Sequence, residues 1–531
     1  MRLLRLFIIL VSWYASSALA ALDPTPLRQL ANEDSDVKIT ALQKIAQSAD
    51  PQSVDQLAAR VLKAMAEDRL FIAKNQIFML EGEQAIDAAS GAAITPTPEN
   101  PESIVVNNRV RNALTAALAA LNLFNPDRAV RLDATKTLTQ SVDASLAPLL
   151  ARALGQETDP KIKTQLEQVL AFANLQHANS ALRLAAVKTL AASTSPEVKS
   201  TLNARLTAEP DEAVRIAIRA SLRDIERRLA IGEQVGRVFS GISLGSVLLL
   251  AALGLAITYG VMGVINMAHG ELLMIGAYAT YMVQGVFRDH LPDYLDWYVV
   301  AAIPVAFFSA ALVGILMERT VIRWLYGRTL ETLLATWGLS LILIQAARVI
   351  FGSQNVELAN PSWMSGGVVM VSNLVLPWNR IFIIGFALLV LLLVWVLLNR
   401  TRLGMFVRAV TQNRPMASCV GVPTGRIDSL AFGLGAGIAG LGGVALSQIA
   451  NVGPDMGQGY IVDSFMVVVL GGVGQLAGTV WAALGLGVVS KFLEGWVGAV
   501  IAKIAVLVFI IIFIQKRPQG LFALKGRFVE N

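Results

Sequence analysis

The chain has few of the residue types on which several classes of protein depend. Its 531 residues include a single cysteine, Cys419, which excludes an internal disulfide and a cysteine-bound metal cluster. Only 15% of the residues are charged whereas 55% are hydrophobic, and this composition excludes an ordinary soluble protein. No glycine-rich turn is followed by Lys-Ser or Lys-Thr, so the chain carries no nucleotide-binding P-loop.

The sequence also lacks the residue patterns of an enzyme. No serine, histidine and acid set, metal-ligand cluster or cofactor loop rises above chance in it. We therefore expect no catalytic residue, no bound metal and no cofactor.

Charge is distributed unevenly between two parts of the chain. Residues 21–237 contain 25 basic and 26 acidic residues, whereas residues 238–531 contain 17 basic and 12 acidic ones. The basic excess therefore belongs to the hydrophobic part, where it is typical of the orientation signal of a membrane protein rather than of nucleic-acid binding.

Residues 1–20 have the three-part pattern of a secretory signal peptide. Arg2 and Arg5 give a positive start, residues 6–11 are apolar, and Ala18-Leu19-Ala20 is a cleavage pattern of small residues. A short first membrane anchor is the alternative, but the apolar run is short for a spanning helix. We expect cleavage after Ala20 and export of the residues that follow.

Residues 21–235 are predicted to form an exported α-helical domain. An apolar-basic pair followed by small and aliphatic residues at helical spacing recurs from Val37, Val130, Leu182 and Val214. This pattern resembles degenerate HEAT-like repeats, in which each unit buries its apolar face against its neighbours. An irregular all-α bundle is the alternative. His177 is interpreted as a surface or capping residue, and the proline-rich residues 95–101 as a loop.

From residue 238 onward the chain is predicted to cross a membrane about eight or nine times. The apolar segments are residues 239–264, 267–287, 298–318, 330–350, 381–399, 427–450, 463–476, 477–493 and 497–515. Segment 463–476 is short and glycine-rich, which favours a broken or partial crossing. Twelve basic residues fall on one predicted face and three on the other, which predicts an outside start, a cytoplasmic C-terminus and an odd number of crossings.

Four stretches of the hydrophobic part carry a resemblance to a known family. They are GLAITYGVMGVINMAHGELLMIGAY (254–278), LLATWGLSLILIQAARVIFG (333–352), RAVTQNRPMASCVGV (408–422) and FMVVVLGGVGQLAGTVWAALGLGV (465–488). In this order they resemble the permease subunits of branched-chain amino acid ABC importers. The signal peptide and long exported helical domain are most similar to the urea importer permeases within that family. The resemblance implies a second homologous permease subunit, two cytoplasmic ATPase subunits and a periplasmic binding protein.

Residues 402–426 form a basic, polar interlude between two apolar segments and are predicted to dock the ATPase. Arg402, Arg408, Arg414 and Arg426 are expected to face water. An apolar face for a groove on the partner is expected from Met405, Phe406, Ala409, Val410, Ala417 and Val420. The helix is expected to end at Gly421, Pro423 and Gly425. A solvated, positively charged cytoplasmic loop is the alternative. Because the chain has no P-loop, ATP must be hydrolysed on another subunit.

Polar and glycine residues inside the predicted spans are the candidates for a solute pathway. Asn266, His269 and Glu271 offer donors and acceptors at membrane depth, although capping of a helix in the turn between two spans explains them equally well. For the glycines at 433, 435, 437, 440, 442 and 443 we predict close helix packing. Packing and pathway lining both remain open for Gly471, Gly472, Gly474 and Gly478.

Charged residues near the last predicted spans are further candidates for functional residues. Lys491 and Glu494 are predicted to form an ion pair on one helix face, and Lys503 is expected to extend to an interface. Asp455 and Asp463 flank a predicted outward-facing loop, where they either contact the binding protein or are solvated.

These observations predict an all-α, polytopic permease subunit of a bacterial inner-membrane ABC importer. Its solute is predicted to be urea, with branched-chain amino acids or short amides as the alternative, moved by alternating access between periplasm and cytoplasm. A stand-alone channel or secondary transporter, and a membrane-anchored structural protein, are alternatives from other classes.

Overall fold

The computed structural model describes residues 22–48, 56–74, 76–82, 84–96, 98, 101–140, 143–193, 195–371 and 374–522. The predicted signal peptide, residues 1–20, lies outside this part of the chain. The chain divides into two compact units, residues 1–229 and 230–531. Helix α11 (Glu212–Met262) contains the boundary between them.

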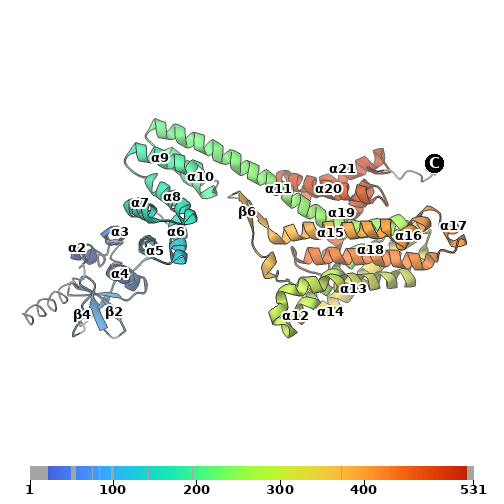
Figure 1. Ribbon diagram of the computed structural model, residues 1–531, viewed down its shortest axis with the longest axis horizontal. Helices are drawn as coiled ribbons and strands as arrows, with labels where there is room; N and C mark the ends of the chain where they lie inside the picture. Colours follow the sequence, from blue (N-terminus) through green and yellow to red (C-terminus); the bar gives the residue numbers. More distant parts are fainter. Residues whose placement is uncertain are drawn as a thin grey trace, which may run out of the picture. The chain divides into compact units, whose positions relative to one another are not determined.

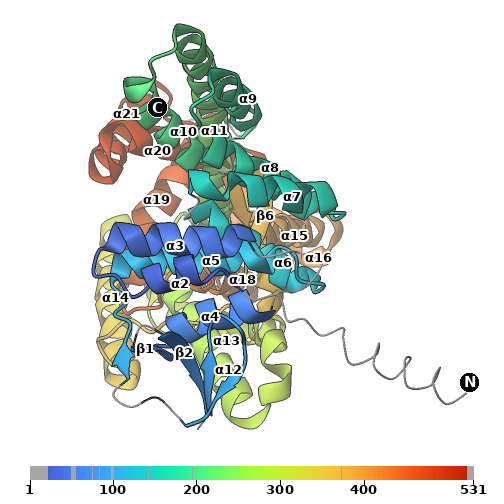
Figure 2. The same ribbon diagram turned by 90° about the vertical axis from the view of Figure 1, so that its left-hand side faces the viewer.

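The N-terminal unit is built mostly from short helices that pack in chain order. α8 packs against α7 and α9, and α3 against α5 (Figure 2). Polar caps begin several of these helices, since Asn107, Asp159 and Asn179 accept hydrogen bonds from the first turn of α5, α8 and α9. The helices are α2 (Pro24–Gln29), α3 (Ser35–Ser48), α4 (Gln56–Ala66), α5 (Asn108–Asn122), α6 (Arg128–Gln140), η1 (Ala144–Leu146), α7 (Ala147–Gln156), α8 (Pro160–Asn174), α9 (Ser180–Ala191) and α10 (Pro196–Ala208).

A five-stranded antiparallel sheet interrupts these helices, so the prediction of an all-α domain was wrong for residues 70–103. The strand order is β4-β3-β2-β1-β5, and Phe71 of β1 lies opposite Phe78 of β2. Aromatic and β-branched residues in this segment favour strands, and the helical template in the surrounding sequence concealed that preference. The strands are β1 (Leu70–Ala73), β2 (Gln76–Glu81), β3 (Gln84–Asp87), β4 (Ala93–Ile94) and β5 (Glu102–Ser103).

Two equivalent ion pairs recur in the N-terminal unit. Arg131 pairs with Glu157 at 2.8 Å and donates to the carbonyls of residues 125 and 126. Arg183 pairs with Glu209 at 2.6 Å and donates to the carbonyls of residues 177 and 178. Each arginine lies 26 residues before its glutamate and six residues after the first carbonyl it binds. The repetition supports the HEAT-like interpretation, which stays a prediction.

We expect the Arg183→Met substitution to destabilise the N-terminal unit by about 3 kcal/mol, because it leaves the buried Glu209 carboxylate without its main partner. Arg60→Met is the matched control. Its ion pair with Glu81 is exposed, so a loss below about 1 kcal/mol is expected. Thermal unfolding of a fragment spanning residues 22–229 measures both, and equal losses would contradict the account.

The same ion pairs predict how the stability of this unit depends on pH. Burial alone would raise the pKa of Glu209, but hydrogen bonds from Arg183, the Asp211 backbone and Arg205 outweigh it and lower the pKa below its ordinary value of 4.5. The carboxylate therefore contributes stability above about pH 4.5, and the contribution is lost as the pH falls through the lowered folded-state pKa. The Arg183→Met fragment should lose less stability on acidification than the unsubstituted one.

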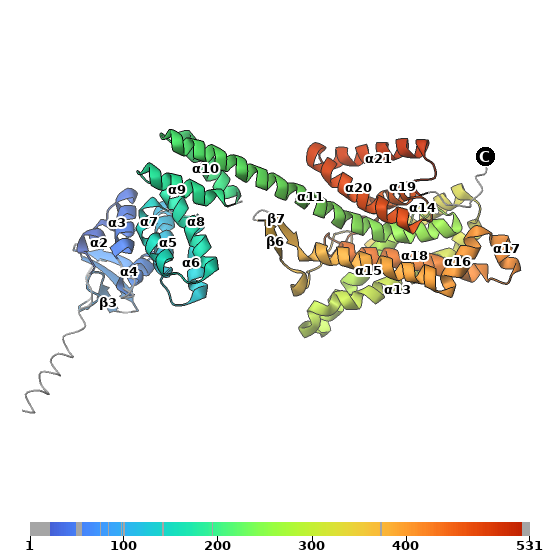
Figure 3. The ribbon, with the colours of Figure 1, turned by 45° about the horizontal axis from the view of Figure 1, so that its top comes forward.

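The second unit is a bundle of long apolar helices (Figures 1 and 3). Seven helices in the described part of the chain are long and apolar enough to cross a membrane, and α19 is a shorter apolar helix. α12, α13 and α18 pack against one another, as do α19, α20 and α21 in chain order. The helices that follow α11 are α12 (His269–His290), η2 (Pro292–Trp297), α13 (Tyr298–Thr320), η3 (Ile322–Leu325), α14 (Thr329–Phe351), η4 (Ser362–Met364), α15 (Trp378–Arg400), α16 (Arg402–Gln412), α17 (Arg414–Cys419), α18 (Thr424–Ser447), α19 (Met456–Gly471), α20 (Leu476–Val497) and α21 (Ala499–Lys516).

The bundle has two ends that differ in structure. α15 begins directly after a hairpin formed by β6 (Gly367–Val371) and β7 (Leu374–Pro377), and it ends directly before α16. We call these the hairpin end and the α16 end. Asn379 in the first turn of α15 donates to the carbonyl of Gln448, which places the end of α18 and the start of α19 at the hairpin end.

Glycines hold the centre of the bundle together, as predicted for the cluster at 433–443. A Cβ added at Gly440 would lie 2.6 Å from the Ala306 carbonyl oxygen, and one at Gly443 would lie 2.0 Å from that of Leu273. Such approach of α18 to α13 and α12 is possible only without a side chain. The packing interpretation is therefore confirmed for this cluster.

Candidate functional site

The segment expected to dock a partner folds as two short helices, α16 and α17. Thr401 caps α16 by accepting from the Gly404 amide, and Asn413 caps α17 by accepting from Met416. Gly404 is required for packing, since a Cβ there would lie 2.0 Å from the carbonyl oxygen of Leu398. After α17 the chain turns at Gly421, whose φ of +86° favours glycine.

Only part of the apolar face that was expected to contact a partner is exposed in the structure. Val410 and Ala417 are buried, together with Val407, against Ile427 and Ala431 of the same unit, so they cannot form a docking surface. Phe406 and Ala409 are half-buried in this cluster. The large apolar side chains that remain exposed are Met405, Met416 and Val420. We call these three residues the exposed apolar set.

The arginines of this segment have different environments. Arg402 and Arg426 are exposed, and Arg408 donates a hydrogen bond to the carbonyl of Leu398. Arg414 was expected to face water, but it forms an ion pair with the buried Asp428 of α18 and lies 4.7 Å from the centre of the Tyr326 ring. Arg414 is therefore an anchor of α17 as well as a surface charge.

A second buried carboxylate, Glu318 of α13, extends this anchor. Tyr326 donates to Glu318 Oε1 at 2.9 Å, and Ser429 of α18 donates to Glu318 Oε2. Arg323 approaches Glu318 at 3.4 Å and donates to the Gly425 carbonyl at 3.3 Å. The network of Glu318, Arg323, Tyr326, Arg414, Asp428 and Ser429 thus joins α17 to α13 and α18. We call it the anchor network.

Sequence reasoning missed most of the anchor network. Glu318 and Ser429 are 111 residues apart along the chain, so no local spacing indicates their contact. The available signal was the cost of burying a carboxylate inside an apolar span, which applies to Glu318 and Asp428 as well as to Glu271.

Asn266, His269 and Glu271 are all buried, in the turn between α11 and α12 and in the first turn of α12. Asn266 Oδ1 accepts from the Ala268 amide at 3.0 Å, and His269 Nε2 lies 2.9 Å from the Ala251 carbonyl oxygen. Each residue keeps one side-chain polar atom without a partner in the described structure, namely Asn266 Nδ2, His269 Nδ1 and Glu271 Oε2. Asn266 does not cap α12, because the N-cap position is Ala268 and no side chain caps the helix there; its bond to the Ala268 amide closes the turn before the helix. The free atoms of all three residues fit a polar pathway, which stays a prediction.

The comparison that decides the family covers residues 237–515. These residues match the family model described as "Branched-chain amino acid transport system / permease component". The chain belongs to this permease family. The match covers more than half of the chain and contains α12 to α20 whole, together with most of α21 and the second part of α11.

Three relatives show how far the similarity extends. The permease is 30% identical over 292 residues to the high-affinity branched-chain amino acid transport system permease protein LivH of Salmonella typhimurium, covering 54% of this chain and 94% of that protein. It is 28% identical over 291 residues to the corresponding protein BraD of Pseudomonas aeruginosa, with the same coverage. It is 25% identical over 291 residues to the ribose import permease protein RbsC of Escherichia coli, covering 52% and 85%. No solved structure matches the chain.

The glycines considered for pathway lining form a turn at the α16 end of the permease. α19 ends at Gly471, and Gly472 and Gly474 have φ values of +98° and +80°. A Cβ on Gly471 would lie 2.5 Å from the carbonyl carbon of Gly478, and one on Gly472 would lie 2.4 Å from the Phe522 carbonyl oxygen. Close packing explains Gly471, Gly472 and Gly478, and the positive φ of Gly474 favours glycine there. Pathway lining by these residues stays a prediction. The predicted segment 463–476 is part helix and part turn.

Asp455 and Asp463 lie in different environments. Asp455 precedes α19 and is 62% exposed, with both carboxylate oxygens within 3.0 Å of Arg348. Asp463 is in the middle of α19, only 20% exposed, and pairs with Lys503 of α21 at 3.1 Å. Asp463 therefore does not flank the predicted outward-facing loop, because its helix begins seven residues earlier. The predicted ion pair of Lys491 and Glu494 is confirmed at 2.5 Å.

No group of three or more histidine, cysteine or acidic residues in the described part of the permease could hold a metal ion.

Proposed function

We propose that the chain is the membrane-spanning permease subunit of an ATP-driven importer and that α16 and α17 dock a cytoplasmic ATPase. The observation that carries this proposal is the anchor network, which ties the two short helices to α13 and α18. A partner that moves α17 would therefore move two central spans. The exposed apolar set and the basic residues around it offer that partner an apolar contact with a charged rim.

Family membership supports the remaining partners. Permeases of ABC importers work with ATPase subunits and a solute-binding protein, and we propose a second homologous permease subunit, two ATPases and a periplasmic binding protein here. The α16 end is proposed to face the cytoplasm of a bacterial cell, because Arg402, Arg408, Arg414 and Arg426 lie there. The N-terminal unit is proposed to be exported to the periplasm by the signal peptide.

The proposed solute is urea. This proposal rests on the long N-terminal unit, which precedes the family match at residue 237 and gives the chain its resemblance to urea importer permeases. Branched-chain amino acids are the second candidate, favoured by the names of the relatives from Salmonella typhimurium and Pseudomonas aeruginosa.

Uptake of labelled urea and labelled leucine at micromolar concentration, in cells carrying or lacking this gene, separates the two solutes. Loss of energy-dependent urea uptake alone is the result we expect. Loss of leucine uptake alone would keep the permease function and reject urea, whereas loss of neither would reject both proposed solutes.

The N-terminal unit is proposed to hold the binding protein on the permease. We expect deletion of residues 22–229, with the signal peptide kept, to lower uptake at least fivefold at low solute concentration and to change it little when the binding protein is in large excess. Tethering raises the effective concentration of a partner, which is the physical reason for this difference. Unchanged uptake at every binding-protein concentration, with equal permease in the membrane, would refute the role.

A further inference from the structure

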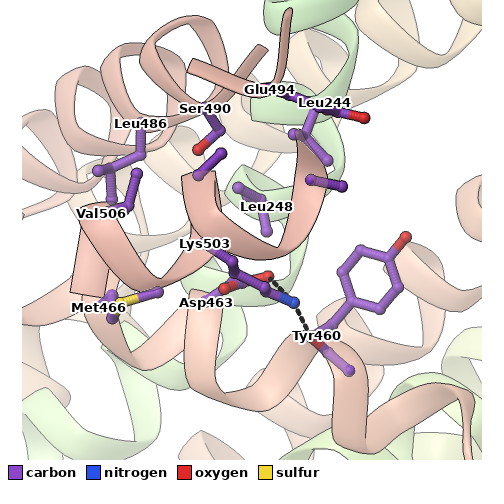
Figure 4. A pocket seen from close by; sticks show the side chains of 13 residues that line it. Leu244, Leu248, Tyr460, Asp463, Met466, Leu486, Ser490, Glu494, Lys503 and Val506 are labelled. Atoms are coloured by element: carbon purple, nitrogen blue, oxygen red, sulfur yellow. Dashed lines mark hydrogen bonds and ion pairs between the residues drawn. The ribbon is translucent and has the colours of Figure 1, made fainter. Parts of the chain in front are cut away.

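A cavity of about 290 Å³ lies between α11, α19, α20 and α21 at the hairpin end of the permease. Its volume is well above the roughly 10–15 Å³ that a cavity needs to hold one water molecule, so it can hold a solute of a few heavy atoms with some water. Apolar walls come from Leu244, Leu248 and Leu486 (Figure 4).

The polar groups of this cavity carry both signs of charge. Lys503 Nζ lies 3.1 Å from Asp463 Oδ2 and donates to the Gly459 carbonyl at 3.3 Å. Figure 4 shows the Lys503 side chain directed at Asp463 and the backbone of α19. Ser490 and Glu494 of α20 also line the cavity. Hydrogen-bond donors and acceptors are therefore present within one small space.

The position of the ion pair indicates that this cavity adjoins water rather than lipid. Charged side chains in hydrocarbon are costly, and those that persist face the bundle interior or a water-filled space and pair with one another or with backbone carbonyls, as Lys503 does with Asp463 and Gly459. Lysine can extend to a membrane surface, but aspartate has a short side chain. Asp463 lies seven residues into α19, about 10 Å along the helix axis from its start, so its short side chain does not extend to the end of that helix.

We propose that this cavity is a solute-binding site on the path into the permease, with Asp463 and Lys503 as its binding residues. The solute class is a small molecule that carries N–H donors next to an oxygen acceptor. Its N–H groups donate to the Asp463 carboxylate, and its oxygen accepts from the Lys503 ammonium. Urea and the α-amino and carboxylate groups of an amino acid share this chemistry. The inference rests on the proposed transport function and names the residues that recognise the solute.

The kinetic test compares uptake by the complete importer carrying Asp463→Asn or Lys503→Gln with uptake by the unsubstituted importer. Each substitution removes a charge-assisted hydrogen bond to the solute, so we expect the KM for uptake to rise at least tenfold. Asp289→Asn is the matched control, because Asp289 forms an exposed ion pair with Arg288 outside the cavity. Its KM should change less than twofold.

A second measurement, the rate of thiol labelling in the cavity, leaves Asp463 and Lys503 unchanged. Ser490→Cys places a thiol of nearly the same size in the cavity, and a Cys419→Ser background removes the exposed native cysteine. In the assembled importer, a membrane-impermeant methanethiosulfonate reagent should label Cys at 490, and millimolar urea or leucine should slow that labelling. Asp289→Cys in the same background should be labelled at a rate that neither solute changes.

The outcomes distinguish failure of the proposed binding site from failure of the proposed transport function. Protection by urea alone or by leucine alone supports the site and selects the solute. Labelling without protection, or no labelling because a second subunit covers the cavity, overturns the site, as does an unchanged KM in both charge variants. Absence of uptake by the unsubstituted importer would instead refute the proposed function itself.

Discussion

Replacing Arg414 with methionine is expected to lower ATP-driven uptake at least tenfold while leaving the ATPase bound. The substitution leaves Asp428 buried without its cation and removes the contact over Tyr326. Loss of one partner of a buried ion pair costs about 3–5 kcal/mol, and the 40% exposure of Arg414 places the cost near the lower figure. The exposed apolar set is unchanged, so docking should persist while movement of α17 no longer reaches α13 and α18. Uptake of labelled solute and co-purification of the ATPase measure the two effects.

Arg328→Met is the matched control for this prediction. Arg328 precedes α14, and its guanidinium pairs with the exposed Glu331, so its removal should change uptake less than twofold. Normal uptake in the Arg414→Met importer would contradict the role of the anchor network. Loss of ATPase binding in the same variant would show that Arg414 docks the partner and is not an internal anchor.

Replacing Gly443 with alanine is expected to abolish assembly of a folded permease. The new Cβ would lie 2.0 Å from the Leu273 carbonyl oxygen and 2.7 Å from the Ala277 amide nitrogen. Both atoms belong to the backbone of α12, so α12 and α18 must separate. The expected cost is about 3 kcal/mol or more, the upper part of the range for overpacking. Thermal unfolding of the purified protein and its yield from membranes report the change.

Gly285→Ala controls for the substitution itself. Gly285 is also in α12, but nothing lies within 4 Å of the position that its Cβ would take. Alanine there should leave the yield unchanged or improve it, because alanine favours a helix over glycine by about 0.5–1 kcal/mol. Equal stability of the two variants would refute the packing role of Gly443.

Contacts within one helix or between apolar segments were predictable from sequence. The Lys491 and Glu494 pair follows from helical spacing, and the packing of the 433–443 glycines follows from small residues in an apolar span. Seven of the nine predicted apolar segments lie in helices long and apolar enough to cross a membrane, since hydropathy and length decide a span. The exceptions are segment 267–287, whose helix α12 does not meet that criterion, and segment 463–476, which is part of a shorter helix and a turn.

Contacts between distant segments were not predictable in the same way. Arg414 was assigned to water because it lies in a basic loop, yet its partner Asp428 is fully buried in the next helix. Asp463 was expected to flank a loop because glycine and proline precede it, whereas it lies within α19 and Lys503 of α21 pairs with it from 40 residues away. The sheet at residues 70–103 was not predicted, because the helical repeat pattern was extended across this segment and the pairing of its strands was not considered.

Uptake into proteoliposomes containing this permease, its partner permease, the ATPase subunits and the binding protein tests the transport account most directly. The account predicts accumulation of labelled urea only under two conditions. ATP must be present on the side of the membrane that carries the ATPase subunits, and the binding protein must be present on the opposite side. Uptake by vesicles that contain the permease without ATPase subunits, at a rate unaffected by ATP, would contradict it and indicate a channel or a secondary transporter.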